Sequence, residues 1–381
     1  MIKIGLRHNL RFPLILIIFN CFRRIDLIIM EKSLRFDIFT SLLTLQMFLG
    51  EFVVGLIIYV YQKNFLSKKK SRQTFMGIEL VQVTSEISTP DKPYKIYLLL
   101  FFASFFDFVE FILSTFYLSF FKEISKTLEM RLSGLLTISS ALFFIFLLKL
   151  QIFKHQVFSL IIIFICLIII VVLEFLFTEI NIEPLMIIFS IHFFNSLLDS
   201  IEKYLIEFNY LNPFKTLMME GLFGVIITSI YSFRENPFRE AKEFYNNNEH
   251  YKFIILIFLL FLYFVLCGGR NVYRVLTNKI YSPMTKSLTD YILNPLLILY
   301  YYFYDDDFNK NLTLFIINLI LSIIIVLFGC IYNDILVLFC CDLEHDTHLQ
   351  VSLRATIDKN NIEEESEKDS FEDDDNDDNM D

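Results

Sequence analysis

The chain has 381 residues, of which 55% are hydrophobic, with 45 phenylalanines and no tryptophan. This apolar content, gathered in long runs, excludes an ordinary soluble domain, and the absence of basic patches with aromatic residues gives no sign of nucleic-acid binding. The formal net charge of −10 comes almost entirely from residues 358–381, which carry 13 acidic residues and two lysines, so the rest of the chain is close to neutral.

The first segment, residues 1–35, fits no simple class. Its apolar run, Phe12–Phe22, is about half the length that a membrane-spanning helix needs, and Arg23 and Arg24 interrupt it. The segment is predicted to be a degenerate first helix, an interfacial helix or the result of a misplaced gene start. No small-residue cleavage site follows the apolar run, which disfavours a signal peptide.

From residue 36 onward, long apolar segments alternate with polar connections. A lipid core is about 30 Å thick, so a spanning helix needs roughly 20 apolar residues. Because several runs are apolar on every side, they favour helices over the alternating strands of a barrel. We therefore predict nine membrane-spanning helices, at 36–62, 94–121, 130–150, 155–178, 184–206, 213–233, 251–269, 282–303 and 311–341.

Basic residues at the ends of the spans predict the topology. Lysine and arginine next to a span tend to stay in the cytosol. The cluster Lys68–Lys70 with Arg72, after the first span, predicts a cytosolic end there. Alternating from this point, we expect Arg270, Arg274 and Lys279 to belong to a cytosolic connection, and we expect a cytosolic C-terminus.

Charged and amide side chains inside the expected spans are the candidates for substrate binding. Polar groups at membrane depth are costly, and they normally face the bundle interior or a water-filled cavity. Asp107 and Glu110 share one helix face because they are three residues apart. The full candidate set is Glu51, Asp107, Glu110, Asn195, Asp199, Glu220, Lys286, Asp290 and Asn294.

Two local patterns in the eighth expected span leave alternatives open. Lys286 and Asp290 are four residues apart and are predicted to pair, either as part of a binding site or only to let both charges enter the membrane. Asn294–Pro295 is predicted to kink the helix, because proline removes a backbone hydrogen bond. The kink serves either a gate or only packing.

Small residues are expected at helix contacts, since they let backbones approach closely. The glycines that fall in or at the spans are Gly50, Gly134, Gly221, Gly224, Gly268, Gly269 and Gly329.

An enzyme is not expected. The chain has no GxGD motif of intramembrane aspartyl proteases, no phosphate-binding loop and no Ser-His arrangement. The one histidine pair with close spacing, His345 and His348, lies after the last span. No catalytic residue, metal or cofactor is therefore predicted.

Four strings of residues resemble the EamA-type drug/metabolite transporter superfamily, and most closely its nucleotide-sugar-transporter-like solute carriers (solute carrier family 35-like). They are QMFLGEF at Gln46–Phe52, Glu202–Lys203 followed by LNPFKTLMMEGLFG at Leu211–Gly224, YRVLTNKIYSPMTKSLTDYILNP at Tyr273–Pro295, and FGCIYNDILVLF at Phe328–Phe339. The resemblance covers about residues 36–348 and rests on the order and spacing of the strings.

The resemblance implies an all-α fold of ten helices in two five-helix repeats of inverted topology. It places the first repeat at 36–178 and the second at 184–341, with the first helix degenerate or missing in residues 1–35. Residues 342–381 are then a cytosolic, acidic and disordered tail. The family's basic residue before the fourth helix is displaced here to Arg131, and Lys286 stands where relatives carry a basic residue in the ninth helix. The resemblance therefore implies that Lys286 contacts an anionic substrate.

The expected function is transport of a small organic solute, of the nucleotide-sugar or drug/metabolite class, by alternating access around a polar midplane cavity. Asp199, Glu220 or Asp290 would carry a proton or balance Lys286. The alternative is a membrane scaffold or receptor that does not transport and acts through its acidic tail. The expected partners are the solute and the lipid bilayer, with a second copy of the chain and a cytosolic partner of the tail as further candidates. By analogy, the location is an internal membrane such as the Golgi or the endoplasmic reticulum.

Overall fold

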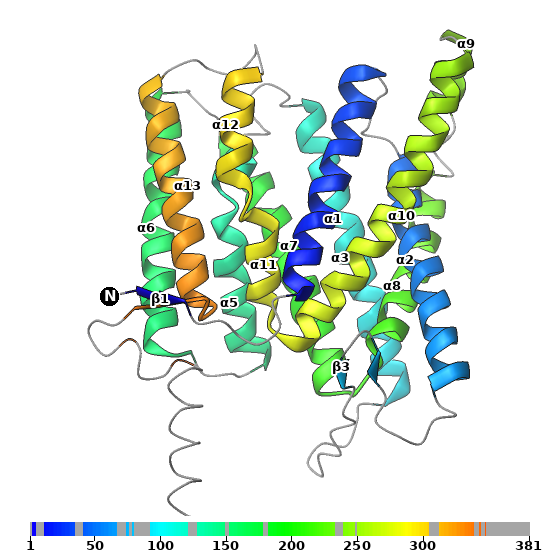
Figure 1. Cartoon of the computed structure of the whole chain (residues 1–381), viewed down its shortest axis with the longest axis horizontal. Coiled ribbons are helices and arrows are strands. Elements are labelled where there is room, and N and C mark those ends of the chain that lie inside the picture. The colour runs from blue at the N-terminus through cyan, green and yellow to red at the C-terminus, as the bar shows by residue number, and fades with distance from the viewer. Residues whose placement is uncertain are drawn as a thin grey trace, which may run out of the picture.

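The protein is a bundle of helices in the computed structural model (Figure 1). The structure describes residues 2–4, 11–34, 41–66, 74–75, 78–79, 92–120, 128–148, 152–177, 182–232, 239–247, 250–304, 312–338, 343 and 347.

The helices fill most of the described chain. Their bounds are α1 Arg11–Ile28, α2 Ser41–Tyr61, α3 Pro93–Phe120, α5 Gly134–Leu148, α6 Lys154–Phe177, α7 Ile182–Glu207, α8 Pro213–Ser232, α9 Arg239–Asn247, α10 His250–Ile280, α11 Pro283–Tyr291, α12 Asn294–Tyr304 and α13 Leu312–Tyr332. Short π-helices, Ile29–Ser33 and Gln62–Leu66, extend α1 and α2.

Two antiparallel strand pairs complete the described elements. Strand β1 (Ile2–Ile4) pairs with β4 (Leu336–Leu338), with Lys3 opposite Val337. Strands β2 (Thr74–Phe75) and β3 (Ile78–Glu79) form the second pair. We call the side of the bundle with β1 and the α10–α11 turn the β1 end, and the opposite side the α9 end (Figure 1).

Seven of the described helices, α2, α3, α6, α7, α8, α10 and α13, are long and apolar enough to cross a membrane. The chain is thus a polytopic membrane protein. Nine spans are not confirmed, because α5 is a shorter apolar helix and the segment expected at 282–303 is divided into α11 and α12. The segment expected at 311–341 is helical only to Tyr332, where a turn with Asp334 at a positive φ of 57° leads into β4.

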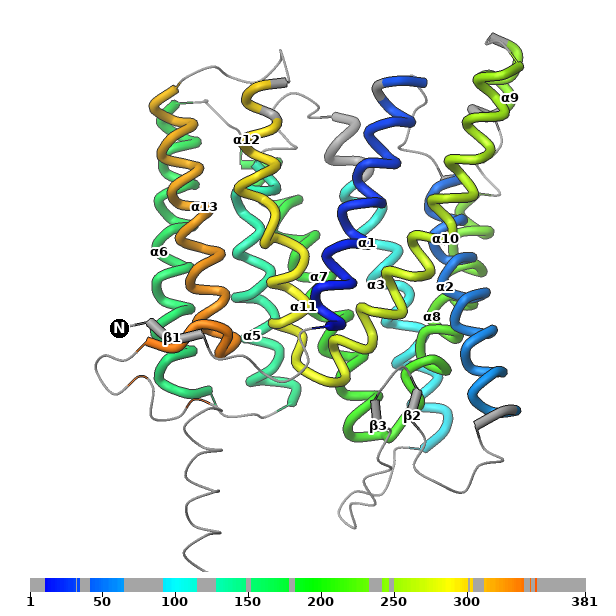
Figure 2. The backbone as a smooth tube through the Cα atoms, in the orientation of Figure 1, coloured from blue at the N-terminus to red at the C-terminus, as the bar shows by residue number. Residues whose placement is uncertain are grey.

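Two interruptions of regular helix lie close together inside the bundle. One is at Ile292–Leu293, between α11 and α12 (Figure 2), and the other is at Leu132–Ser133, just before α5. Asn294 joins the breaks, because its Nδ2 donates to the Met130 carbonyl at 3.0 Å and to Ser133 Oγ at 2.8 Å. The predicted kink at Asn294–Pro295 therefore coincides with the division of the segment into α11 and α12, and it packs against the second interruption.

Residues 11–28, which fitted no class by sequence, form a helix inside the bundle. Helix α1 packs against α10 and α11, and its Asn20 is 7% exposed. It begins at the β1 end and runs toward the α9 end (Figure 1). Arg23 and Arg24 do not end the helix, because they face the charged interior described below.

Helix α10 is longer than the span predicted at 251–269. The helix continues to Ile280, and it stops where Ser282 caps α11 by accepting a hydrogen bond from the Thr285 backbone N–H, with Pro283 at the first helical position. Arg270 and Arg274 thus lie within α10, and their assignment to a cytosolic connection is wrong.

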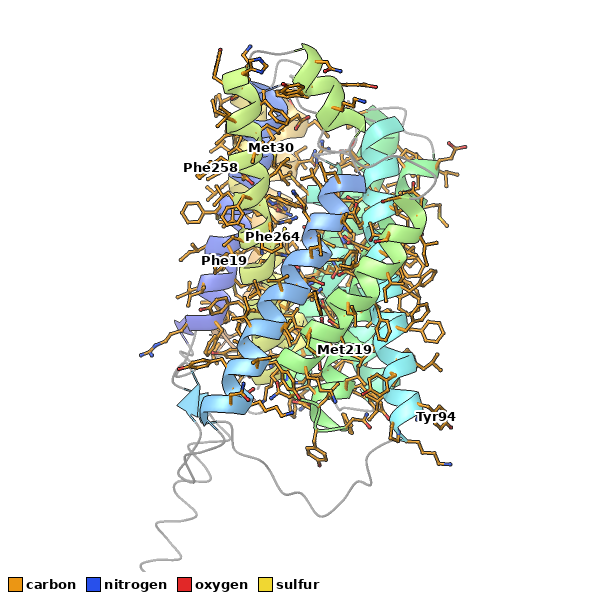
Figure 3. The ribbon with its side chains drawn as sticks, turned by 90° about the vertical axis from the view of Figure 1, so that its right-hand side faces the viewer. Phe19, Met30, Tyr94, Met219, Phe258 and Phe264 are labelled. Carbon is orange, nitrogen blue, oxygen red and sulfur yellow. The ribbon has the colours of Figure 1, made fainter. Side chains whose placement is uncertain are left out.

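Apolar clusters surround the centre of the bundle. One joins α5, α6, α11 and α13 through residues such as Leu167, Tyr291 and Ile325, and another joins α2 and α10 through Phe48 and Tyr263. Large apolar side chains cover the outside, as Phe258 does where it points away from α10 (Figure 3). The polar centre is therefore shielded from the lipid on several sides.

Glycines permit a close approach between α2 and α10. A Cβ at Gly50 would lie 2.6 Å from the Phe264 carbonyl oxygen, and one at Gly268 would lie 2.8 Å from the Gly50 carbonyl oxygen. Both obstacles are backbone atoms, which cannot rotate away. The expected role of small residues at helix contacts is confirmed at this crossing.

Replacing Gly50 by alanine is expected to destabilise the protein by about 1–3 kcal/mol, the usual cost of overpacking. The thermal unfolding midpoint of the purified protein would measure this. Gly134→Ala is the matched control, because its Cβ would meet only side-chain methyl groups of Ile163 and Ile325 at 3.1 Å. Equal midpoints for the two variants would contradict the proposed close contact.

Candidate functional site

Arg274 occupies the centre of a group of four carboxylates, each from a different helix. Its Nη2 lies 2.7 Å from Glu202 Oε1 of α7, 3.5 Å from Glu220 Oε2 of α8 and 3.8 Å from Glu51 Oε1 of α2, and its Nη1 lies 3.8 Å from Asp107 Oδ2 of α3. We call Arg274 and these four side chains the Arg274 cluster. It ties α10 to the four surrounding helices.

Lys286 of α11 forms a second ionic group beside the first. Its Nζ lies 2.8 Å from Asp199 Oδ2 and 3.0 Å from Asp290 Oδ2, and it donates to Asn195 Oδ1 at 2.7 Å. The predicted pair between Lys286 and Asp290 is confirmed. The contacts with Asp199 and Asn195 show that it is more than an intrahelical pair.

Amide side chains connect the two groups. Asn278 donates through Nδ2 to Glu202 at 2.6 Å and to Asp199 at 3.3 Å. Asn271 donates to Glu51. One continuous polar network therefore links α2, α3, α7, α8, α10 and α11.

The network carries an excess of negative charge. In the Arg274 cluster, one guanidinium faces four carboxylates, and Glu51, Glu202, Glu220 and Arg274 are each at most 3% exposed. Like charges at this range repel strongly in an interior of low dielectric constant. Bound protons or a cationic ligand would relieve that repulsion, so the cluster is suited to binding one of them.

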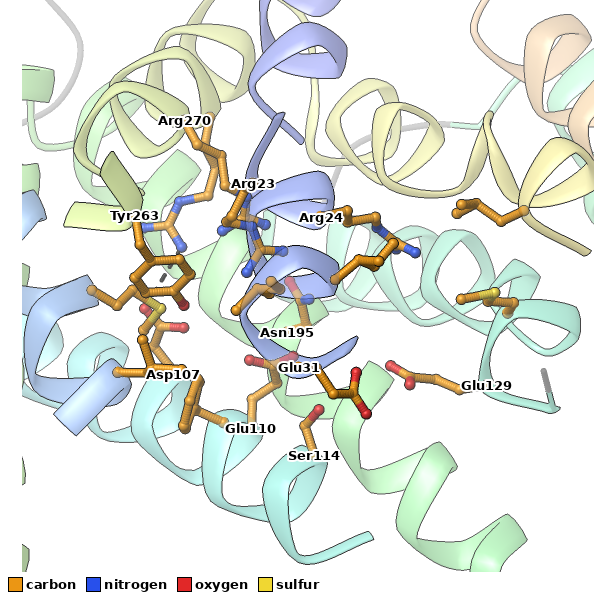
Figure 4. Close-up of a pocket in the computed structure, with 18 of the residues that line it drawn as sticks. Arg23, Arg24, Glu31, Asp107, Glu110, Ser114, Glu129, Asn195, Tyr263 and Arg270 are labelled. Atoms are coloured by element: carbon orange, nitrogen blue, oxygen red, sulfur yellow. Dashed lines mark ion pairs between the residues drawn. The ribbon is translucent and has the colours of Figure 1, made fainter. Parts of the chain in front are cut away.

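A cavity of about 270 Å³ adjoins this network (Figure 4). Arg274 and Lys286 line it, and we call this part of its lining the floor. Its walls carry further charges, namely Arg23, Arg24, Glu31, Asp107, Glu110, Glu129 and Arg270. The cavity also reaches Ile28 and Ser114, toward the α9 ends of α1 and α3. It is therefore a charged chamber inside an otherwise apolar bundle.

A smaller cavity of about 150 Å³ adjoins the first and shares several lining residues with it. It extends to the two helix breaks, where Asn294 and Ser133 line it, and to His192 of α7. Asp290 also lines it, held by Arg270 at 3.8 Å and by Asn20 Nδ2 at 3.2 Å. The breaks in the helices thus border a polar chamber.

All nine residues predicted from the sequence as candidates meet in this region. Glu51, Asp107 and Glu220 surround Arg274, while Asn195, Asp199 and Asp290 hold Lys286. Glu110 and Asn294 line the two cavities. The structure brings the side chains together, and their role in binding stays a prediction.

Sequence reasoning missed the cations that complete the site. Arg270 and Arg274 had been placed outside the membrane, and Arg23 and Arg24 had been treated as an interruption. One sequence signal could have predicted the longer helix. Ser282–Pro283 is a typical helix start, and it predicts that the preceding helix continues almost to that point. Arg131, the displaced basic residue, pairs with Glu174 of α6 and does not line either cavity.

Lys203 holds the β1 end of the network closed. Its Nζ donates to the carbonyl oxygens of Lys279 and Tyr281, both at 3.2 Å, and lies 2.5 Å from Glu207 Oε1. Glu202 and Lys203 therefore both contact the last part of α10, because Glu202 contacts Arg274 and Asn278, and Lys203 contacts the carbonyl groups at its end. This end of the bundle is tied to α7.

Replacing Lys203 by methionine is expected to open the β1 end at least about tenfold more often, since hydrogen bonds from a charged group are each worth roughly 1.5–3 kcal/mol. A cysteine placed at the buried Thr277 of an otherwise cysteine-free chain would report this as faster labelling by a water-soluble maleimide. Lys215→Met is the control. An unchanged labelling rate would show that Lys203 does not hold this end.

In comparisons with known proteins, no family model matches the chain, and no curated protein does. The fold and the charged cavity are thus the basis for any inference about function.

Proposed function

We propose that the protein is a membrane transporter of a small organic solute, working by alternating access. The observation that carries this proposal is a charged cavity, enclosed by six or more helices, beside two interruptions of regular helix. Substrate sites of secondary transporters lie near the bilayer midplane and are typically formed by discontinuous helices. Buried charges in this number weaken the packing of a purely structural bundle, whereas they suit a binding site.

We further propose that the helices form two five-helix repeats, as the resemblance to EamA-type transporters implies. Helix α1 would then be the first helix of the family, which the sequence had suggested to be degenerate or missing. The repeats would relate α1, α2, α3, α5 and α6 to α7, α8, α10, the α11–α12 pair and α13. Packed pairs agree with this exchange, because α3 packs on α7 as α1 packs on α10, and α2 packs on α10 as α8 packs on α3.

We also propose a topology. With α1 as a span, the basic N-terminal segment falls on the same side as the cluster Lys68–Lys70, and the β1 end is cytosolic. The acidic tail lies outside the described residues, apart from Leu343 and Thr347, and we propose that it is cytosolic. The cavity then faces the opposite compartment, as in one of the two states of an alternating-access cycle. An internal membrane is proposed by analogy with the resembling family alone.

Uptake into proteoliposomes of the purified full-length protein tests the proposal. The panel would contain UDP-glucose, UMP, the standard L-amino acids and tetraethylammonium. Saturable uptake of any of them, blocked by excess unlabelled solute, is the expected result. Absence of uptake for every member, with protein that unfolds cooperatively on heating, would contradict the proposal and favour the scaffold alternative.

A further inference from the structure

The large cavity has walls of opposite charge. The guanidinium groups of Arg23, Arg24 and Arg270 lie on the side of α1 and α10, and the carboxylates of Asp107, Glu110 and Glu129 lie across from them (Figure 4). A cavity for a purely anionic solute would not need the second wall, and one for a purely cationic solute would not need the first. The arrangement fits a ligand that carries both signs.

The acidic wall contains a carboxylate that is available to bind a ligand. Glu110 has no hydrogen bond or ion pair within the described part of the chain, although its carboxylate lines the cavity. Among the described residues, the ion pair of Asp107 is with Arg274, at 3.8 Å, and Arg274 is shared with three other carboxylates. A ligand ammonium group would therefore find in Glu110 a carboxylate that makes no ion pair with any described residue.

The basic wall likewise has a donor available. Arg270 donates through Nε to Asn20 and through Nη1 to Asn271, and its Nη2 lies 3.8 Å from Asp290. Its side chain is 15% exposed, toward the two cavities. The contacts with Asn20 and Asn271 fix the direction of the guanidinium, so Nη2 is positioned to bind a ligand carboxylate.

The size of the chamber restricts the ligand further. Pockets for drug-sized ligands measure about 300–1,000 Å³, and this one measures about 270 Å³. A chamber of this size suits a molecule of amino-acid size. A nucleotide sugar would bring two phosphate charges toward Glu110 and Glu129, whereas a zwitterion with its charges a few bonds apart avoids that repulsion.

Resting on the proposed transport function, we propose that this cavity binds a small zwitterionic solute of the amino-acid type. Arg270 and Arg23 hold its carboxylate, and Glu110 and Asp107 hold its ammonium group. The Arg274 cluster forms the floor beneath the ligand. The site thereby selects against nucleotide sugars, which the resemblance alone had left as a substrate class.

Equilibrium binding to the purified full-length protein tests the assignment. Each standard L-amino acid is screened by the shift in thermal unfolding midpoint, and the best one is compared with two analogues, one lacking the amino group and one lacking the carboxylate. Both analogues are expected to bind at least about tenfold more weakly, the loss that follows from one missing charge-assisted hydrogen bond.

Two variants are expected to change the affinities for the amino acid and its analogues selectively, which a general structural defect would not do. Glu110→Gln is expected to weaken the amino acid about tenfold and leave the amino-free analogue unchanged. Arg270→Gln is expected to weaken the amino acid and leave the carboxylate-free analogue unchanged. Glu183→Gln and Arg11→Gln, at exposed positions in α7 and α1, are the matched controls.

If no standard amino acid binds, the zwitterion assignment is wrong. It is also wrong if Glu110→Gln and Arg270→Gln change the binding of the amino-free and the carboxylate-free analogues in the same way. The uptake panel separates this failure from that of the proposed function. If UDP-glucose or tetraethylammonium is transported while no amino acid binds, the protein is a transporter with another substrate. If nothing is transported, an amino acid that binds with the expected pattern still establishes the site.

Discussion

Arg274→Met is expected to lose about 3–5 kcal/mol of stability or to prevent accumulation of folded protein. The substitution removes the cation shared by Glu51, Asp107, Glu202 and Glu220, and breaking a buried ionic group by removing one partner leaves uncompensated charge. The thermal unfolding midpoint and the yield of monodisperse protein measure the effect. Arg11→Met, at an exposed position in α1, controls for loss of a positive charge.

A second substitution identifies the origin of that loss. Glu202 makes the shortest contact with Arg274, at 2.7 Å, so Arg274→Met combined with Glu202→Gln is expected to recover part of the stability. Recovery would show coupling through charge and not only through packing volume. If Arg274→Met unfolds at the temperature of the unaltered protein, the central role of the cluster is wrong.

Lys286→Met is expected to reduce uptake at least tenfold and also to lower the unfolding midpoint. The first effect follows from its place in the cavity floor, and the second from leaving Asp199 and Asp290 without their shared cation. Lys154→Met, at the exposed start of α6, is the control for the same substitution elsewhere.

Stability and transport can be separated at this position. Lys286→Met combined with Asp199→Asn removes one charge of each sign and is expected to restore most of the stability without restoring uptake. Uptake at the level of the unaltered protein in this double variant would mean that Lys286 only helps the aspartates to enter the membrane. That was the structural alternative left open by the sequence.

Apolar run length predicted the class of protein correctly, because lipid leaves the backbone few choices beyond helices. Apolar run length did not predict the segments in which buried charged residues lie inside the bundle. Residues 11–28 fell short of a span by composition, and of the alternatives left open the structure shows a helix inside the bundle, in which Arg23 and Arg24 line a charged cavity. Hydropathy treats an arginine as a cost, and it does not count the partners that the tertiary structure supplies.

The candidate acids were found because an isolated carboxylate in an apolar run is conspicuous. Arg274 was missed because it lies near the end of its run, where an arginine is ordinarily solvated. Only the meeting of five helices shows that Glu51, Asp107, Glu202 and Glu220 share one cation. Such convergence depends on contacts between residues more than about 50 positions apart, and no local pattern encodes it.

The pairing of β1 with β4 has a consequence for the order in which the molecule is made. Ile2–Ile4 precede all the described helices in the chain, whereas their partners, Leu336–Leu338, follow α13. This strand pair can therefore close only after the segment that forms α13 has been synthesised.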